Sequence, residues 1–190
     1  MSEQKPRALV VLAEGAEEME AIITVDVLRR AGVEVVLAGL DGAGPVTCSR
    51  KVRVVPDGAL AGCSGDFDVL VLPGGAEGAR RLAESPEVGR LLREREQRGA
   101  LVAAICAAPM ALARHGVFAG RRTTSHPSVK EIVAAHGTLV EEPVVDDGNL
   151  VTSRGPGTAF LFALHLVERL CGAEKAREVK EPMVFAEDGA

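Results

Sequence analysis

A cysteine stands where the chain is predicted to turn from a strand into a helix. The segment Ala103–Pro109 reads A-A-I-C-A-A-P, so an apolar run ends at Cys106 and small residues follow it. This layout is typical of a nucleophile elbow, in which a tight turn exposes the reactive side chain at the carboxyl edge of a sheet. Amide groups at the start of the following helix would favour the thiolate over the thiol. A buried, inert cysteine is the alternative, and this segment alone does not separate the two.

Two glycines follow another apolar run, in the segment Leu72–Gly75, which reads L-P-G-G. Glycine lets the backbone come close to a ligand, and the amide groups of such a turn can stabilise an oxyanion. A plain strand-to-helix turn uses the same residues. Because ligand sites in parallel sheets lie at the carboxyl ends of the strands, Gly75 and Cys106 are predicted to share one edge.

Glu20 ends the segment Gly15–Glu20, G-A-E-E-M-E, which follows the first apolar run. Apolar residues surround it on more than one face of a predicted helix, namely Met19, Ile22, Ile23, Val25, Val27 and Leu28. Such a helix is predicted to be buried by the sheet and by a second subunit. Burial would raise the pKa of Glu20, so that the carboxyl group keeps a proton at neutral pH and can donate it to a thiolate. A solvent-facing glutamate is the alternative.

Two further side chains lie in predicted loops. His126 follows a short polar strand, and a histidine there can act as the base for a cysteine nucleophile or serve only as a hydrogen-bonding loop residue. Arg154 lies in the compact loop 151–157, where it would bind an anionic substrate or cap carbonyl groups. The four histidines show no metal-ligand spacing, so no metal site is predicted.

The elements that must position these residues alternate between strand and helix. Strands buried on both faces are predicted at Ala8–Ala13, Val33–Ala38, Val69–Leu72 and Leu101–Ile105. Helices are predicted at Glu17–Arg30, Pro86–Arg98, Ala107–His115 and Gly157–Cys171. Short strand pairs are predicted at Val46–Cys48 with Lys51–Val55, and at Val144–Val145 with Leu150–Ser153. This alternation predicts an α/β fold, with a mostly parallel sheet between two layers of helices.

Bulk composition limits the class of protein. The chain of 190 residues is long enough for one domain, and the last ten residues are expected to be loosely ordered. The net charge of −5 without a basic patch argues against nucleic acid as a partner. The apolar runs are too short for a signal peptide or a membrane span, so a cytoplasmic protein is expected. The four cysteines form no C-x-x-C pair, which fits a reducing compartment.

Six motifs, taken in order, resemble one family. They are R-A-L-V-V-L-A-E-G-A-E-E-M-E, V-D-V-L-R-R-A-G-V, P-V-T-C-S-R, V-L-V-L-P-G-G, A-A-I-C-A-A-P and T-S-R-G-P-G-T-A-F. From about residue 7 to 184 the chain resembles the ThiJ/PfpI superfamily, and within it the branch of Parkinson disease protein 7, also called protein deglycase. The resemblance implies a flavodoxin-like three-layer α/β/α sandwich, a homodimer and no cofactor.

The resemblance also implies roles for individual residues. Cys106 would be the oxidation-sensitive nucleophile and Glu20 its protonated partner, with the backbone amides of Gly75 and Ala107 around the sulfur. His126 would lie close by. The surrounding polar shell would comprise Arg30, Arg50 and Arg154. Cys48 would be a second, less reactive cysteine near the dimer interface.

The family activity implied is that of a cofactor-free oxidative-stress protein acting on reactive dicarbonyls. It would convert methylglyoxal to lactate, as a glyoxalase does, and remove early glycation adducts from proteins. The alternative is a redox sensor or redox-regulated chaperone without significant turnover, in which oxidation of Cys106 is the signal. A protease is disfavoured, because Ala107 stands where the protease branch carries a histidine. The family resemblance also allows a location in the nucleus or the mitochondrion.

Overall fold

The computed structural model describes residues 5–185, and its centre is a seven-stranded sheet in the order β10-β11-β7-β6-β1-β2-β5. Its strands are β1 (Arg7–Leu12), β2 (Glu34–Gly39), β5 (Gly58–Ala59), β6 (Val69–Leu72), β7 (Leu101–Ile105), β10 (Val144–Asp146) and β11 (Leu150–Ser153). Neighbouring strands run parallel, except that β10 is antiparallel to β11. The predicted mostly parallel sheet is therefore confirmed.

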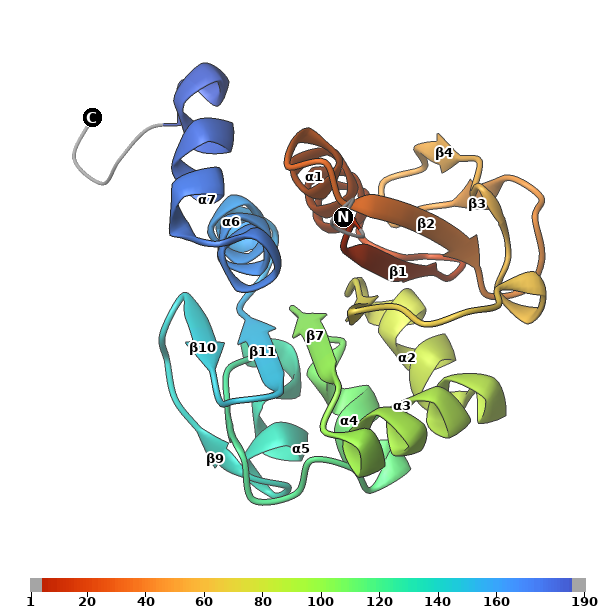
Figure 1. The fold of residues 1–190 in the computed structure, drawn as a ribbon. Helices are drawn as coiled ribbons and strands as arrows, with labels where there is room; N and C mark the ends of the chain where they lie inside the picture. Colours follow the sequence, from red (N-terminus) through yellow and green to blue (C-terminus); the bar gives the residue numbers. More distant parts are fainter. Residues whose placement is uncertain (1–4, 186–190) are drawn as a thin grey trace.

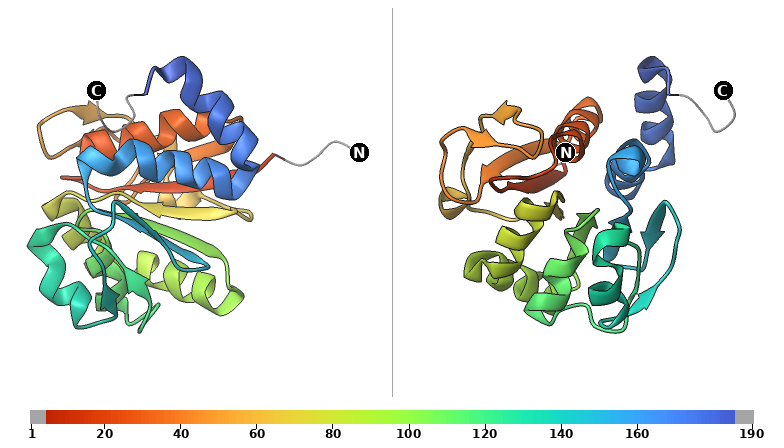
Figure 2. Two further views of the ribbon diagram at one scale, coloured as in Figure 1. Left: turned by 90° about the vertical axis from the view of Figure 1, so that its left-hand side faces the viewer. Right: turned by 180° about the vertical axis from the view of Figure 1, so that it is seen from behind.

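Helices cover both faces of this sheet (Figure 1). One face carries α1 (Glu18–Arg30), α6 (Ala159–Cys171) and α7 (Ala173–Lys180), and the other carries α2 (Ala76–Glu84), α3 (Pro86–Arg98) and α4 (Pro109–His115). The short helix α5 (Lys130–Ala134) packs against α4. When the five long parallel strands are numbered along the chain, they lie in the order 2-1-3-4-5 across the sheet, which is the flavodoxin-like arrangement. The view from behind in Figure 2 shows the same three layers, so the predicted fold class is confirmed.

The strands are apolar on both sides because both sides are covered. In β1, Val10 and Leu12 belong to the core beneath α1 and α6, whereas Leu9 and Val11 belong to the core beneath α2, α3 and α4. All four residues of β6 are buried. Continuous Val and Leu runs therefore predicted strand positions to within a residue, since neither face needs polar side chains.

Two small sheets accompany the main one. The hairpin predicted near residues 46–55 is present as β3 (Val46–Thr47) paired antiparallel with β4 (Arg53–Val54). Two strands that were not predicted as a pair, β8 (Arg122–Thr123) and β9 (Thr138–Leu139), lie parallel. Residues 5–185 also contain four 3₁₀ turns: η1 (Leu60–Gly62), η2 (Pro127–Val129), η3 (Pro156–Thr158) and η4 (Glu181–Met183).

Some helix boundaries differ from prediction. The helix expected from Ala107 begins at Pro109, because residues 106–108 form the turn that leaves β7. The helix expected from Gly157 begins at Ala159, after η3. In the C-terminal segment expected to be loosely ordered, residues 181–183 form η4, and residues 186–190 lie outside the described part. Within residues 5–185, no helix has the length and apolar character needed to cross a membrane.

Candidate active site

The loops after four parallel strands meet at one edge of the sheet. They follow β1, β6, β7 and β11, and backbone hydrogen bonds join them in pairs. Glu17 N donates to Gly74 O at 3.0 Å, and Cys106 N donates to Ser153 O at 2.9 Å. The junction of β1 and β6 is the point at which strand order reverses, where ligands bind in open α/β sheets.

Cys106 occupies the tight turn that its sequence context predicted. Its φ angle is 64°, a left-handed conformation that costs a residue with a Cβ about 1–2 kcal/mol. The turn is held on both sides, since Cys106 N donates to Ser153 O and Cys106 O accepts from His126 N at 2.8 Å. The side chain is nearly buried, with 7% of the residue exposed. Strain retained at one buried thiol is typical of a functional position.

Glycines let the loop after β6 lie against this turn. A Cβ on Gly74 would stand 2.6 Å from Cys106 Cβ and 2.8 Å from Ile105 O, distances that no side chain tolerates without movement. Gly75 has a φ of 84° and caps the start of α2. The amides of Gly75 and Ala107 hydrogen-bond to the Cys106 sulfur and lower its pKa. The predicted pair of amide donors is thus at the sulfur, although Ala107 lies in the turn rather than in helix α4.

Glu20 is fully buried at the start of α1. Gly74 N donates to Glu20 Oε2 at 2.7 Å, which fixes the direction of the carboxyl group. Its other oxygen, Oε1, is buried and makes no hydrogen bond of normal geometry within residues 5–185. Burial raises the pKa of Glu20 to about 7, against the lowering effects of Cys106 and the Gly74 amide. The predicted buried carboxyl with a raised pKa is present.

Cys106 and Glu20 titrate as a coupled pair, because each contributes to the other's pKa. Burial is the main cause that raises the pKa of the Cys106 thiol, to about 12, and the negative charge of Glu20 is the next. A proton on Glu20 removes that second cause. The sulfur is therefore easiest to ionise while Glu20 is protonated.

His126 and Arg154 lie on the loops that flank the cysteine turn. His126 Nδ1 lies 2.8 Å from Ser128 Oγ and accepts from Ser128 N at 3.2 Å, so the Nε2 side of the ring carries any contact with a substrate. A Cβ on Gly155, the residue after Arg154, would lie 3.6 Å from His126 Cδ2. Arg154 is half-buried and forms no ion pair within the described residues. The loops that carry these two residues therefore flank the cysteine turn.

The other two arginines are placed differently. Arg50 lies next to the start of α1, where its backbone N–H donates to Glu18 Oε1 at 2.8 Å and its side chain is exposed. Arg30 ends α1, about 15 Å along the helix from Glu20, and pairs with Asp26 at 2.7 Å. The single chain therefore does not bring Arg30 to the cysteine.

Cys48 differs from Cys106 in its electrostatic surroundings. Burial is the main cause that raises the Cys48 pKa to about 11, and the charges of Glu18, Glu14 and Glu17 act in the same direction. No amide donor opposes these effects. The lower reactivity expected of Cys48 stays a prediction.

Sequence reasoning missed some residues of the site. Gly74, the first glycine of the L-P-G-G motif, orients Glu20 and makes room for the cysteine. Ser49 Oγ lies 2.7 Å from Glu17 Oε2 and 2.8 Å from Glu18 Oε2, which ties the loop after β3 to the start of α1. The glycine pair was a usable signal, whereas the Ser49 contacts join residues more than 30 positions apart. In the part of the chain described, no three His, Cys, Asp or Glu side chains gather to form a metal site.

Known proteins are similar to this chain in sequence. Residues 6–169 match the model of the DJ-1/PfpI family. The chain is 54% identical over 181 residues to protein dj-1beta of Drosophila melanogaster, covering 94% of this chain and 97% of that protein. It is 42% identical over 188 residues to a glutathione-independent glyoxalase of Caenorhabditis elegans, DJR-1.2, covering 98% of this chain and 100% of that protein.

The likeness extends to a solved structure. The crystal structure of Drosophila melanogaster DJ-1beta superposes with a TM-score of 0.95 at 53% identity, covering 97% of this chain and 100% of that one. A homologue of Parkinson disease protein 7 from Danio rerio is 52% identical over 183 residues, covering 94% of this chain and 97% of that protein. With the family model spanning most of the chain and relatives aligned over nearly its full length, this chain belongs to the DJ-1/PfpI family.

Proposed function

We propose that this protein is a cysteine-dependent enzyme that converts reactive dicarbonyls, with methylglyoxal as the type substrate, to hydroxy acids. The observation that carries the proposal is the pairing of Cys106, on its strained turn, with the fully buried Glu20. The relative named as a glutathione-independent glyoxalase supports the same reaction class.

The assignment of the proton follows from the unpartnered oxygen of Glu20. An ionised, buried Oε1 with no donor would carry an uncompensated negative charge, which is costly. The same oxygen as an O–H group can donate to the sulfur. Cys106 as a thiolate would also keep the two amide donors of Gly75 and Ala107. The reactive form is therefore a Cys106 thiolate with a protonated Glu20.

The reaction then proceeds in three steps without net oxidation. The thiolate attacks the aldehyde carbon, and the amides of Gly75 and Ala107 stabilise the oxyanion of the hemithioacetal. Glu20 first gives its proton to this oxyanion and so becomes a carboxylate. The carboxylate then takes the proton from the former aldehyde carbon and returns it to the ketone carbon, while the hydroxyl proton shifts to the neighbouring oxygen, which gives a thioester of the hydroxy acid. Water hydrolyses the thioester, releasing lactate and the free thiol. His126 and Arg154, on the loops that flank the turn, are proposed to orient the substrate oxygens.

The same chemistry extends to early adducts of dicarbonyls on proteins, because a hemithioacetal or hemiaminal releases free aldehyde. The substrate class is thus small aldehydes next to a carbonyl group, free or recently added to Cys, Lys or Arg side chains. No cofactor enters the proposed mechanism.

A sensor function is the second candidate, favoured by the same Oε1 atom. A protonated Glu20 can donate to an oxygen of a Cys106 sulfinate, which would make that oxidation state a stable end point. Mild peroxide followed by mass spectrometry detects this product. Stable sulfinate at Cys106 without lactate formation would favour the sensor or chaperone role over the enzyme.

The enzymatic proposal is tested by incubating purified protein with methylglyoxal and measuring lactate. Cys106→Ser is expected to lower the rate at least about a hundredfold, and Cys171→Ser, which changes a thiol outside the site, is expected to leave it unchanged. Equal rates for the wild type and Cys106→Ser would overturn the proposal.

A homodimer is proposed as the working assembly. Two apolar side chains of α1 remain exposed, Met19 at 50% and Ile22 at 42%, with Val52 beside them at 50%. The backbone of Val52 contacts Glu18, so these residues form one patch at the start of α1. A second copy would cover this patch, since the sheet and α6 already cover the opposite side of the helix.

A further inference from the structure

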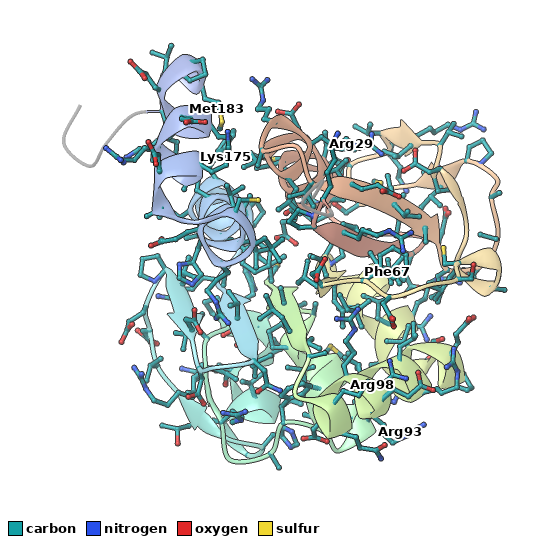
Figure 3. The ribbon with its side chains drawn as sticks, in the orientation of Figure 1. Arg29, Phe67, Arg93, Arg98, Lys175 and Met183 are labelled. Atoms are coloured by element: carbon teal, nitrogen blue, oxygen red, sulfur yellow. The ribbon has the colours of Figure 1, made fainter. Side chains whose placement is uncertain are left out.

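A cavity of about 400 Å³ lies far from Cys106, toward the amino ends of the strands. Its floor is formed by Leu9 of β1, Leu70 of β6 and Leu60. Its walls are the segment before β6, which contains Phe67, and helix α3, which ends at Arg98; both residues are labelled in Figure 3. The volume lies within the range of small-molecule sites.

One face of α3 lines this cavity with three residues spaced by four, namely Glu87, Leu91 and Arg95. Residues with this spacing lie on one side of a helix. The face therefore presents a carboxylate, an apolar side chain and a guanidinium in a row. Glu87 and Arg95 are eight residues apart, so their backbones are separated by about 12 Å.

The charges at the two ends of this row have no ionic partner. Arg95 donates to two backbone carbonyls, Phe67 O at 2.6 Å and Leu101 O at 3.3 Å, which leaves three of its five N–H groups without a hydrogen bond within residues 5–185. Within residues 5–185, neither Glu87 nor Arg95 forms a salt bridge. Both side chains line the same hollow, so their free charges face one binding volume.

The remaining charges at the rim neutralise one another. Arg90 pairs with Glu94 at 2.7 Å, and Arg98 lies 3.5 Å from Asp66. A ligand in the cavity would therefore meet a carboxylate and a guanidinium, neither held in a salt bridge, at opposite ends of an apolar surface. The charges of Asp68 and Asp66 act on Arg95 without pairing with it. Complementary charge requires an ammonium group near Glu87 and a carboxylate near Arg95.

We propose that this cavity binds a short peptide with free termini, its ammonium group at Glu87, its carboxylate at Arg95 and an apolar side chain on the floor between them. A tripeptide spans about 10 Å when extended, which is close to the roughly 12 Å between the backbones of Glu87 and Arg95. A free anion or a purely apolar molecule would leave one of the two charges without a partner. The site does not depend on Cys106 or on the proposed enzymatic activity.

The test uses the tripeptide Ala-Leu-Ala and two capped forms, N-acetylated and C-amidated, with binding measured by calorimetry or NMR. Loss of either terminal charge is expected to weaken binding about tenfold in wild type. In Glu87→Gln, acetylation should no longer matter while amidation still does. In Arg95→Gln, amidation should no longer matter while acetylation still does.

Arg93→Gln is the matched control, because Arg93 belongs to the same helix, is exposed and does not line the cavity. It should bind all three peptides as wild type does. Should Arg95→Gln fail to fold, protection of Cys63 in the wild type gives a second readout, since Cys63 lines the cavity and Cys171 does not. The free peptide should slow alkylation of Cys63 and leave Cys171 unaffected. Equal affinity of free and capped peptides, or no protection of Cys63, would overturn the proposal.

Discussion

The backbone N–H of Gly74 donates a 2.7 Å hydrogen bond to Glu20 Oε2, and this one contact joins the loop after β6 to the first turn of α1. It leaves Glu20 Oε1 as the oxygen free to exchange a proton with the Cys106 sulfur or with a substrate. The geometry of the pair is therefore set by a glycine that has no side chain of its own.

Replacing Gly74 with alanine should damage both packing and activity. The new Cβ would lie within 2.8 Å of Cys106 Cβ, Glu20 Oε2 and Ile105 O, and a backbone atom cannot move aside cheaply. We expect a loss of about 1–3 kcal/mol in the free energy of unfolding and a large drop in lactate formation. Denaturant titration measures the first effect. Gly44→Ala, at a site with nothing within 4 Å, is the matched control, and equal losses in both variants would contradict this account.

The burial of Glu20 predicts a stability change with pH. Its pKa rises from 4.5 to about 7 in the folded protein, so the folded state holds a proton that the unfolded state has lost. Stability contributed by the neutral group is complete below pH 4.5 and falls as pH rises toward 7, by roughly 3 kcal/mol for a shift of this size. Unfolding of wild type and Glu20→Gln across this range isolates the effect. A constant difference between them would show that folding does not shift the pKa of Glu20.

Thiol reactivity should be ranked by the amide donors at each sulfur. Burial raises the pKa of all four thiols, but only Cys106 has amide donors that favour its thiolate. Limited alkylation with peptide mapping should therefore label Cys106 first. Preferential labelling of the more exposed Cys63 or Cys171 would contradict this ranking.

The proposed dimer is tested at the exposed patch of α1. Ile22→Glu would bury a charge against the partner copy and should shift the protein to monomer. Sedimentation at micromolar concentration measures the assembly. Ile132→Glu changes an isoleucine of similar exposure, 41%, on α5 and should stay dimeric. A wild type that sediments as a monomer would end the dimer proposal.

The success of prediction from sequence differed between elements for physical reasons. Helix α3 was predicted with its observed ends, because Ser85 caps its start, Pro86 occupies its first turn and Gly99 ends it with a φ of 63°. Helix α2 was not predicted, since Gly78 weakens its pattern. A Cβ at Gly78 would lie 2.7 Å from Ala16 Cα, so a long-range contact explains that glycine.

The candidate site was likewise predicted only in part. The turn at Cys106 and the burial of Glu20 could be predicted from apolar runs and small residues near them. The bond between Gly74 and Glu20 joins residues 54 positions apart, which no local pattern encodes. The distance of Arg30 from the cysteine was also not predicted by the motif, because Arg30 lies on the same helix as Glu20 but at the other end.

The central claim is that a proton on Glu20, together with the amides of Gly75 and Ala107, overcomes the burial that raises the pKa of the Cys106 thiol, so that a Cys106 thiolate coexists with a protonated Glu20 at neutral pH. Titration of thiolate absorbance, taken as the difference between wild type and Cys106→Ser, tests it most directly. We predict thiolate at neutral pH in the wild type, a retained signal in Glu20→Gln, which keeps a neutral donor, and a pKa higher by about one to two units in Glu20→Leu, which loses it. A thiol that ionises only in strong alkali, or a pKa unchanged in Glu20→Leu, would contradict the claim.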